Sequence, residues 1–138
     1  MRILHVIAGL ERAAGTTVFC VRLCEELAAS GHVAGIFYCS EAGSLLSLPR
    51  NPEVLLGRGR MRRIPGLRAA VFSGLSDGAR ALAARLAPEI VHVHALWDPV
   101  THAGVRLARR NGLPLVYSAH GMATPWALAH HAWKKRAA

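Results

Sequence analysis

The chain lacks the features that mark membrane-spanning, disulfide-rich and disordered proteins. None of its apolar runs approaches the roughly 18 residues that a membrane-spanning helix needs. It has only three cysteines and no C-x-x-C pair, so there is no disulfide framework and we expect reduced thiols in the core of a cytoplasmic protein. Charged residues make up 18% of the 138 residues and hydrophobic residues 52%, which excludes a disordered chain. We therefore expect one compact domain.

Acidic residues are also scarce, because 8 Asp and Glu stand against 17 Lys and Arg, for a net charge of +9. Much of the excess lies between Arg58 and Arg68 and at Lys134 to Arg136. The segment from Gly57 to Gly66 is predicted to be a flexible basic loop. Such a cluster favours an anionic partner such as a phosphate or an acidic membrane. Nucleic acid is not expected, because no stacking aromatics alternate with the basic residues. An arginine-rich composition of the source explains the charge equally well. The candidate anion contacts are Arg58, Arg60, Arg62 and Arg63.

Two nucleotide-binding fingerprints are missing. The sequence contains neither G-x-G-x-x-G nor G-x-x-x-x-G-K-[ST], so it predicts no dinucleotide cofactor and no P-loop. His92 and His94 fall on the same face of one predicted strand, but no further ligand occurs at a spacing that suits a metal site. We therefore expect no cofactor and no bound metal.

Short apolar runs alternate with helical patterns along the whole chain. Helices are expected from Thr16 or Thr17, as the cap, to about Ser30, over 67–86, from Pro99 after the Asp98 cap, and from Pro125 after Thr124. The first of these would point Phe19, Cys20, Leu23, Cys24 and Leu27 inward. Strands are expected over 2–8, 32–39, 54–56, 90–94 and 113–118. This alternation predicts an α/β, Rossmann-like parallel sheet of about five strands in the order 3-2-1-4-5, with helices on both faces.

The stretch from Pro88 to Trp126 organises the rest of the chain. It contains two strands that each end in polar residues and lead into a helix. In a parallel sheet the carboxyl ends of neighbouring strands meet at one crevice, opposite the loop that contains Gly15. The residues predicted to meet there are Gly15, Thr16, His94, Trp97, Ser118, His120 and Gly121.

His120 is the strongest candidate for chemistry in this crevice. It follows a strand end and precedes Gly121, so a ligand can approach the backbone, and a neutral imidazole can bond to a sugar hydroxyl. Gly15 precedes a helix N-terminus, which attracts anions, although a plain strand-to-helix turn explains it too. The alternative for Trp97 and His94 is that they pack in the interior and do not line the crevice. His5 and His92 are expected to be structural.

Three segments carry a family resemblance: P-E-I-V-H-V-H-A-L-W, S-A-H-G-M-A-T-P-W-A-L and the W-K-K-R that follows. With the first strand and its loop, they resemble the N-terminal domain of family-4 retaining glycosyltransferases of the GT-B fold. The resemblance implies an acceptor-side domain in cell-surface polysaccharide synthesis, at the inner face of the membrane. It also implies a nucleotide-sugar donor, a saccharide or lipid-linked acceptor, His120 near the transferred sugar and Gly15 near the donor phosphates.

The sequence departs from that family pattern in two ways. Ala14, Ala95 and Ala119 stand where the family often has Gly, Gly and Pro. No two glutamates lie eight positions apart, whereas the family's donor domain carries such a pair. We therefore expect residues 1–138 to be an incomplete N-terminal domain without its donor-binding half, inactive alone. The alternative is a non-catalytic module that binds a partner chain or an anionic ligand.

Overall fold

The fold was analysed on a computed structural model, which describes residues 1–11, 14–40, 46–60, 62–63, 70–71 and 75–129. The strands are β1 (Arg2–Ile7), β2 (Val33–Ser40), β3 (Leu55–Arg60), β4 (Arg62–Arg63), β5 (Ala70–Val71), β6 (Ile90–His94) and β7 (Leu115–Ser118). The helices are α1 (Gly15–Ala29), α2 (Leu75–Leu86), α3 (Pro99–Arg110) and α4 (Pro125–Ala129).

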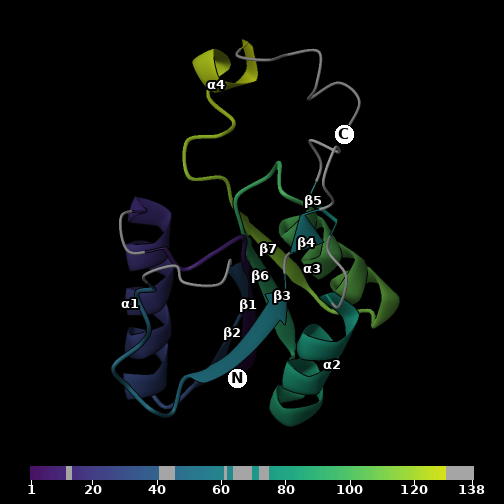
Figure 1. Ribbon diagram of the computed structural model, residues 1–138. Coiled ribbons are helices and arrows are strands. Elements are labelled where there is room, and N and C mark those ends of the chain that lie inside the picture. The colour runs from purple at the N-terminus through teal and green to yellow at the C-terminus, as the bar shows by residue number, and fades with distance from the viewer. Residues whose placement is uncertain (12–13, 41–45, 61, 64–69, 72–74, 130–138) are drawn as a thin grey trace.

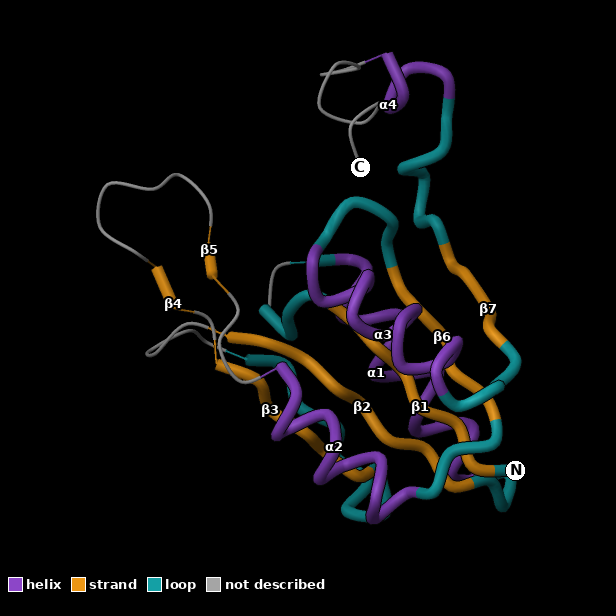
Figure 2. The backbone as a smooth tube through the Cα atoms, turned by 90° about the vertical axis from the view of Figure 1, so that its right-hand side faces the viewer, coloured by secondary structure: helices purple, strands orange, loops and turns teal. Residues whose placement is uncertain are grey.

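Five of the strands form one parallel sheet, in the order β3-β2-β1-β6-β7. Helix α1 covers one face of this sheet, and α2 and α3 cover the other (Figures 1 and 2). The predicted α/β class, the five-stranded Rossmann-like sheet and its strand order are therefore confirmed. β4 and β5 form a separate antiparallel pair beside the main sheet.

Alternating side chains of the central strand β1 supply both halves of the core. Leu4 and Val6 belong to the apolar cluster under α2 and α3. Ile7 belongs to the cluster under α1, which also contains the buried free thiols of Cys20 and Cys24. Because a strand points successive side chains to opposite faces, His5 shares the α1 face with Ile7. The sheet thus carries a buried imidazole on the face that α1 covers.

The third strand is longer than predicted, because it runs over Leu55–Arg60 and not over 54–56. Its glycines, which suggested a loop, instead allow close packing. A Cβ atom on Gly57 would lie 2.8 Å from Cβ of Leu82 in α2, and one on Gly59 would lie 2.6 Å from Sγ of Cys39. The glycines therefore make room for α2 and for the neighbouring strand.

The prediction for the segment that follows was also wrong. Arg58 and Arg60 lie in β3, while Arg62 and Arg63 form β4, so the basic segment is not a continuous loop. The helix predicted over 67–86 begins only at Leu75, and Ala70–Val71 pairs with β4 instead. The glycine at position 74 is a poor helix former and directly precedes the observed start.

Helix α1 begins earlier than predicted and without a threonine cap. Its N-cap residue is Ala14, which forms no side-chain hydrogen bond, and the Thr17 hydroxyl instead donates to the Gly9 carbonyl at 3.4 Å. Cys20 and Cys24 face the core as expected, but Phe19 is 48% exposed. The inward direction predicted for Phe19 was therefore wrong.

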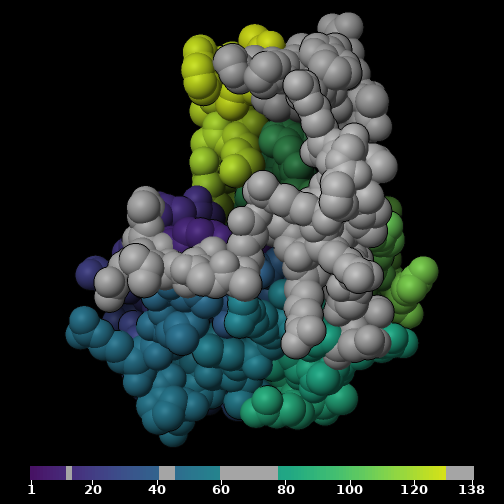
Figure 3. Space-filling model, in the orientation of Figure 1, coloured from purple at the N-terminus to yellow at the C-terminus, as the bar shows by residue number. Residues whose placement is uncertain are grey.

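The two Pro-initiated helices start where the sequence predicts. The Asp98 side chain accepts a hydrogen bond from the Val100 amide at 2.7 Å, and the Thr124 hydroxyl accepts one from the Ala127 amide at 3.3 Å. Helix α4 buries no residue and stands above the body of the domain (Figure 3). Residues 130–138, on which the continuation of this helix was predicted, lie outside the described residues. Among the described residues, no helix is long and apolar enough to cross a membrane.

Candidate functional site: a histidine chain at the carboxyl end of the sheet

The candidate site lies where β1, β6 and β7 end. The parallel register places His5 of β1 beside His92 of β6, and His94 beside Ser118 of β7. His120 follows β7 by two residues. The switch point between β1 and β6 is therefore where the sequence predicts the crevice, at the edge from which the α4 segment rises (Figure 1).

Three imidazoles form a hydrogen-bonded chain from the core to the surface. His5 Nδ1 lies 3.1 Å from His94 Nε2, and His94 Nδ1 lies 3.1 Å from His120 Nε2. His5 and His94 are fully buried, whereas His120 is partly exposed. His94 thus lies below the surface and is hydrogen-bonded to the partly exposed His120. The nitrogen of His120 that remains for a ligand is Nδ1.

Ser118 and His92 form a second pair beside this chain. The Ser118 hydroxyl lies 2.7 Å from His92 Nε2, and the imidazole of His92 stacks on that of His94 with ring centroids 4.2 Å apart. The sequence predicted a crevice role for Ser118 and a structural one for His92. The structure places both next to His94: Ser118 pairs with His94 across the strands, and the His92 ring stacks on the His94 ring. His94 in turn is hydrogen-bonded to His120.

Burial keeps these imidazoles in the neutral form. It lowers the pKa of His94 to about 2 and that of His5 to about 3, with neighbouring histidines adding to the effect. Burial also lowers the pKa of His92 and of His120. A neutral imidazole carries one donor and one acceptor nitrogen, so each ring in the chain can pass a hydrogen bond to the next.

Helix α1 contributes an aromatic side chain that the sequence analysis assigned to the core. The Phe19 ring packs edge-on against His120, with centroids 5.2 Å apart, and lies 6.1 Å from the His94 ring. Phe19 lies three and four positions after Thr16 and Gly15, so these residues share one side of the first helical turns. This spacing was the feature of the sequence that could have assigned Phe19 to the site, because it places Phe19 one helical turn beyond the predicted anion site.

The remaining predicted residues lie in the two loops that follow β6 and β7. The Trp97 indole donates to the Met122 carbonyl at 3.5 Å, which links the loop after β6 to the loop after β7. Gly121 is exposed and has a φ of +79°. Trp97 is 39% exposed, so part of its ring is open to solvent.

Two non-glycine residues of these loops have left-handed backbone conformations. Ala95 has a φ of +83° and His120 a φ of +46°. A Cβ atom disfavours this region by about 1 to 2 kcal/mol per residue. At Ala95, where the resembled family often has glycine, the strain coincides with a hydrogen bond from the Ala95 amide to the Ser118 carbonyl at 2.9 Å. The loops that follow β6 and β7 thus hold this conformation at a local energetic cost.

Replacing Ala95 by glycine is expected to raise the free energy of unfolding by about 1 kcal/mol, because it removes the strained Cβ. Urea denaturation measures the change. The control is Ala81→Gly at an exposed position inside α2, where glycine should cost about 1 kcal/mol. If Ala95→Gly lowered the free energy of unfolding as much as Ala81→Gly does, the backbone at Ala95 would not be strained.

The predicted anion contacts lie away from these residues in the sheet. Arg58 is exposed on β3, at the opposite side of the sheet order from β7. Arg60 is in β3, and Arg62 and Arg63 are in β4. These four arginines are therefore not part of the histidine layer, which consists of His5, His92, His94 and His120.

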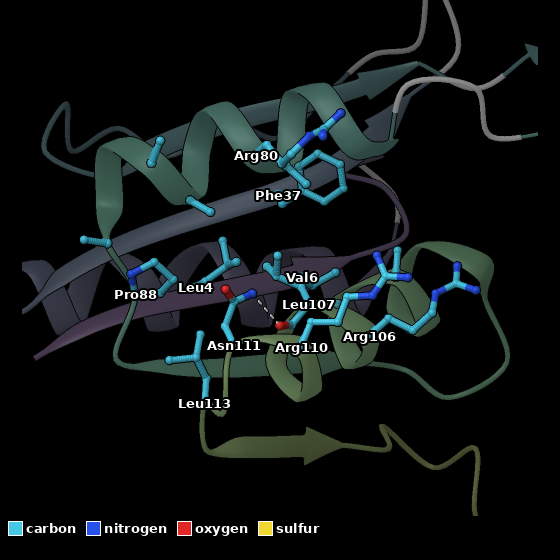
Figure 4. A pocket seen from close by; sticks show the side chains of 16 residues that line it. Leu4, Val6, Phe37, Arg80, Pro88, Arg106, Leu107, Arg110, Asn111 and Leu113 are labelled. Atoms are coloured by element: carbon cyan, nitrogen blue, oxygen red, sulfur yellow. Dashed lines mark hydrogen bonds between the residues drawn. The ribbon is translucent and has the colours of Figure 1, made fainter.

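A large groove lies on the other face of the sheet, between α2 and α3 (Figure 4). It has a volume of about 940 Å³ and an apolar floor that includes Leu4 and Phe37. Arg80, Arg106 and Arg110 also line it. Its lining contains no carboxylate, thiol or imidazole in the part of the chain that the structure describes, so the groove offers no group for acid–base chemistry.

Comparison with known protein families identifies a match. A family model with the description Glycosyltransferase Family 4 matches residues 13–138, which is almost the whole chain. The sequence has no significant match among curated proteins.

Proposed function

The chain belongs to glycosyltransferase family 4, and we propose that it is the acceptor-side domain of a retaining enzyme that transfers a sugar from a nucleotide-sugar. The acceptor is a saccharide or a lipid-linked saccharide in the synthesis of a cell-surface polysaccharide. The observation that carries this proposal is the position of His120, at the partly exposed end of the histidine chain and just beyond the carboxyl end of β7.

In the proposed site, His120 contacts a hydroxyl of the sugar through Nδ1. Its other nitrogen is 3.1 Å from His94 Nδ1, which orients the ring. The neutral form is the one expected at neutral pH, since burial lowers the pKa of His120. A neutral imidazole can donate to or accept from a hydroxyl group, so it matches a sugar without needing a charge.

The start of α1 is the proposed contact for the donor phosphates. Its N-cap residue Ala14 provides no side-chain hydrogen bond, and the first turn contains no acidic residue. Backbone amides at a helix N-terminus and the helix dipole both favour an anion. Phe19, one turn further along, packs against His120, so phosphate and sugar contacts would be neighbours.

Transfer also requires groups that hold the rest of the donor. In the proposal they come from a second, donor-binding domain, because this sequence contains no pair of glutamates at the spacing that the family uses. The proposed reaction breaks the bond between the anomeric carbon and the phosphate oxygen and forms one to an acceptor hydroxyl. The proton of that hydroxyl leaves with the phosphate group.

Titration calorimetry with nucleotide-sugars and with saccharide acceptors tests the proposal. We expect heat of binding with at least one of these ligands, and weaker binding after His120→Ala. A module that serves only a partner chain would give no heat with any donor or acceptor. That outcome, with a folded protein, would reject the proposed function and favour the non-catalytic alternative.

Contact with an acidic membrane is a further part of the proposal. Arg58 is exposed, and a single arginine near an anionic bilayer contributes about 1 kcal/mol of attraction. We therefore expect Arg58→Ser to weaken cosedimentation with anionic liposomes about fivefold, and high salt to do the same. Arg109→Ser, at an exposed position in α3, is the matched control. Equal binding by both variants would remove Arg58 from the membrane contact.

A further inference from the structure

Near the carboxyl ends of β1 and β6, three histidines lie close together. His92 and His94 occupy the same face of β6, and His5 lies beside His92 on β1. One nitrogen of each residue lies within 4.8 Å of the corresponding nitrogens of the other two. We propose that His5, His92 and His94 form a binding site for a divalent transition-metal ion of the Zn²⁺ type.

The spacing of the nitrogens suits such an ion. His5 Nδ1 and His94 Nε2 are 3.1 Å apart. Two imidazole nitrogens on a tetrahedral Zn²⁺, each about 2.0 to 2.1 Å from the metal, are about 3.3 Å apart. Small ring movements would therefore convert the hydrogen-bonded pair into a pair of ligands. His92 stacks on His94 and would supply the third nitrogen.

A second observation marks His5 as incompletely paired. Its Nε2 atom is buried and has no hydrogen-bond partner among the described residues. A buried polar nitrogen without a partner is unfavourable, and such a group in a folded protein needs an explanation. An ion bound through Nε2 would give this atom a partner, whereas an ion bound through Nδ1 would replace the hydrogen bond to His94. Neutral imidazole is also the form that metals bind.

The ligand types decide the class of metal. Imidazole nitrogens suit Zn²⁺, Co²⁺, Ni²⁺ and Cu²⁺, whereas Mg²⁺ and Ca²⁺ require oxygen ligands. No carboxylate belongs to this group of ligands in the part of the chain that the structure describes. Cys20 and Cys24 also lie near His5, and thiolates prefer the same metals as imidazoles do.

A metal at this point would also orient His120. If His94 binds the ion through Nε2, its Nδ1 must carry the hydrogen and donate to His120 Nε2, 3.1 Å away. Hydrogen bonds from metal ligands to such outer groups fix the tautomer and direction of the ring. His92 is only half-buried, so it offers the access route from the crevice. The metal site and the proposed sugar contact would thus be one connected structure, although the metal proposal does not depend on that function.

The test is metal binding by the chelator-treated protein. We expect one equivalent of Zn²⁺ to bind in competition with a chromophoric chelator, and to raise the melting temperature by several degrees. His92→Gln, at the least buried of the three ligands, should weaken Zn²⁺ binding tenfold or more. His102→Gln, at an exposed position of α3, is the matched control and should leave it unchanged.

Cobalt distinguishes the possible ligand sets in the wild-type protein, so the test does not depend on the folding of a variant. Co²⁺ held by the three histidines should give the visible absorption of a tetrahedral ion without a sulfur-to-cobalt charge-transfer band. That band would place the ion on Cys20 and Cys24 and overturn the assignment to His92 and His94. Absence of Zn²⁺ binding, or equal affinity of wild type and folded His92→Gln, would also overturn it.

Discussion

Lowering the pH from about 7.5 to about 5 is expected to lower the free energy of unfolding by about 4 kcal/mol. The cause is the burial of His5 and His94, which lowers the pKa of these side chains in the folded protein to about 3 and about 2. In the unfolded chain a histidine has its ordinary pKa of about 6.5. Between these values the unfolded chain binds more protons than the folded one, so stability falls as the pH falls.

The size of this effect does not depend on the lowered values themselves. At about pH 5 both folded pKa values are well below the pH, so both histidines stay neutral in the folded protein. Protonation of each histidine in the unfolded chain then lowers the free energy of unfolding by about 2 kcal/mol. The loss should begin below about pH 6.5 and grow by about 1.4 kcal/mol per histidine and pH unit. Carboxyl groups contribute little at this pH, because their ordinary pKa values are about 4.

Urea denaturation in the presence of a chelator measures this loss without a contribution from bound metal. His5→Gln should remove about half of the pH-dependent loss, since one of the two buried imidazoles is gone. His102→Gln should retain all of it, because His102 is exposed. A loss of the same size in both variants would show that other groups cause the acid sensitivity.

Replacing His120 by alanine is expected to weaken sugar binding about 10- to 100-fold. The variant removes one hydrogen bond to the ligand and leaves the bound hydroxyl, and His94 Nδ1, without their partner. Leaving such groups unpaired in a desolvated site costs about 1 to 3 kcal/mol. The edge contact of the Phe19 ring with His120 is lost as well.

The affinity of the sugar ligand in titration calorimetry is the quantity to compare. His102→Ala is the matched control, and its affinity should equal that of the wild type. His120→Asn should restore part of the affinity, because an amide can donate and accept a hydrogen bond. A folded His120→Ala protein that binds the sugar as tightly as wild type would contradict the role of His120.

The order of elements was predictable because its signals are local. Apolar runs followed by Asp98-Pro99 and Thr124-Pro125 set two helix starts, and both were confirmed. Alternating strands and helices then leave few ways to build a parallel sheet, since its crossovers are right-handed. The strand order predicted is that of doubly wound sheets, and it was confirmed.

The errors arose where packing overrides local preference. Gly57 and Gly59 indicate a loop by propensity, yet they lie in β3, because the approach of Leu82 and Cys39 leaves no room for a side chain. Phe19 fits the apolar stripe of α1, yet it is half-exposed and borders His120. Propensity and periodicity contain no information about what lies opposite a residue in the fold.

Local pattern was therefore enough for the α/β class and the strand order, whereas the role of His120 stays a prediction. The histidine layer below it was not encoded in any single stretch of sequence. His5 and His94 are 89 positions apart, and His94 and His120 are 26 apart. Only the pairing of β1 with β6 and of β6 with β7 brings these rings into contact, because a side chain's neighbours across a parallel sheet are set by strand register and not by spacing along the chain.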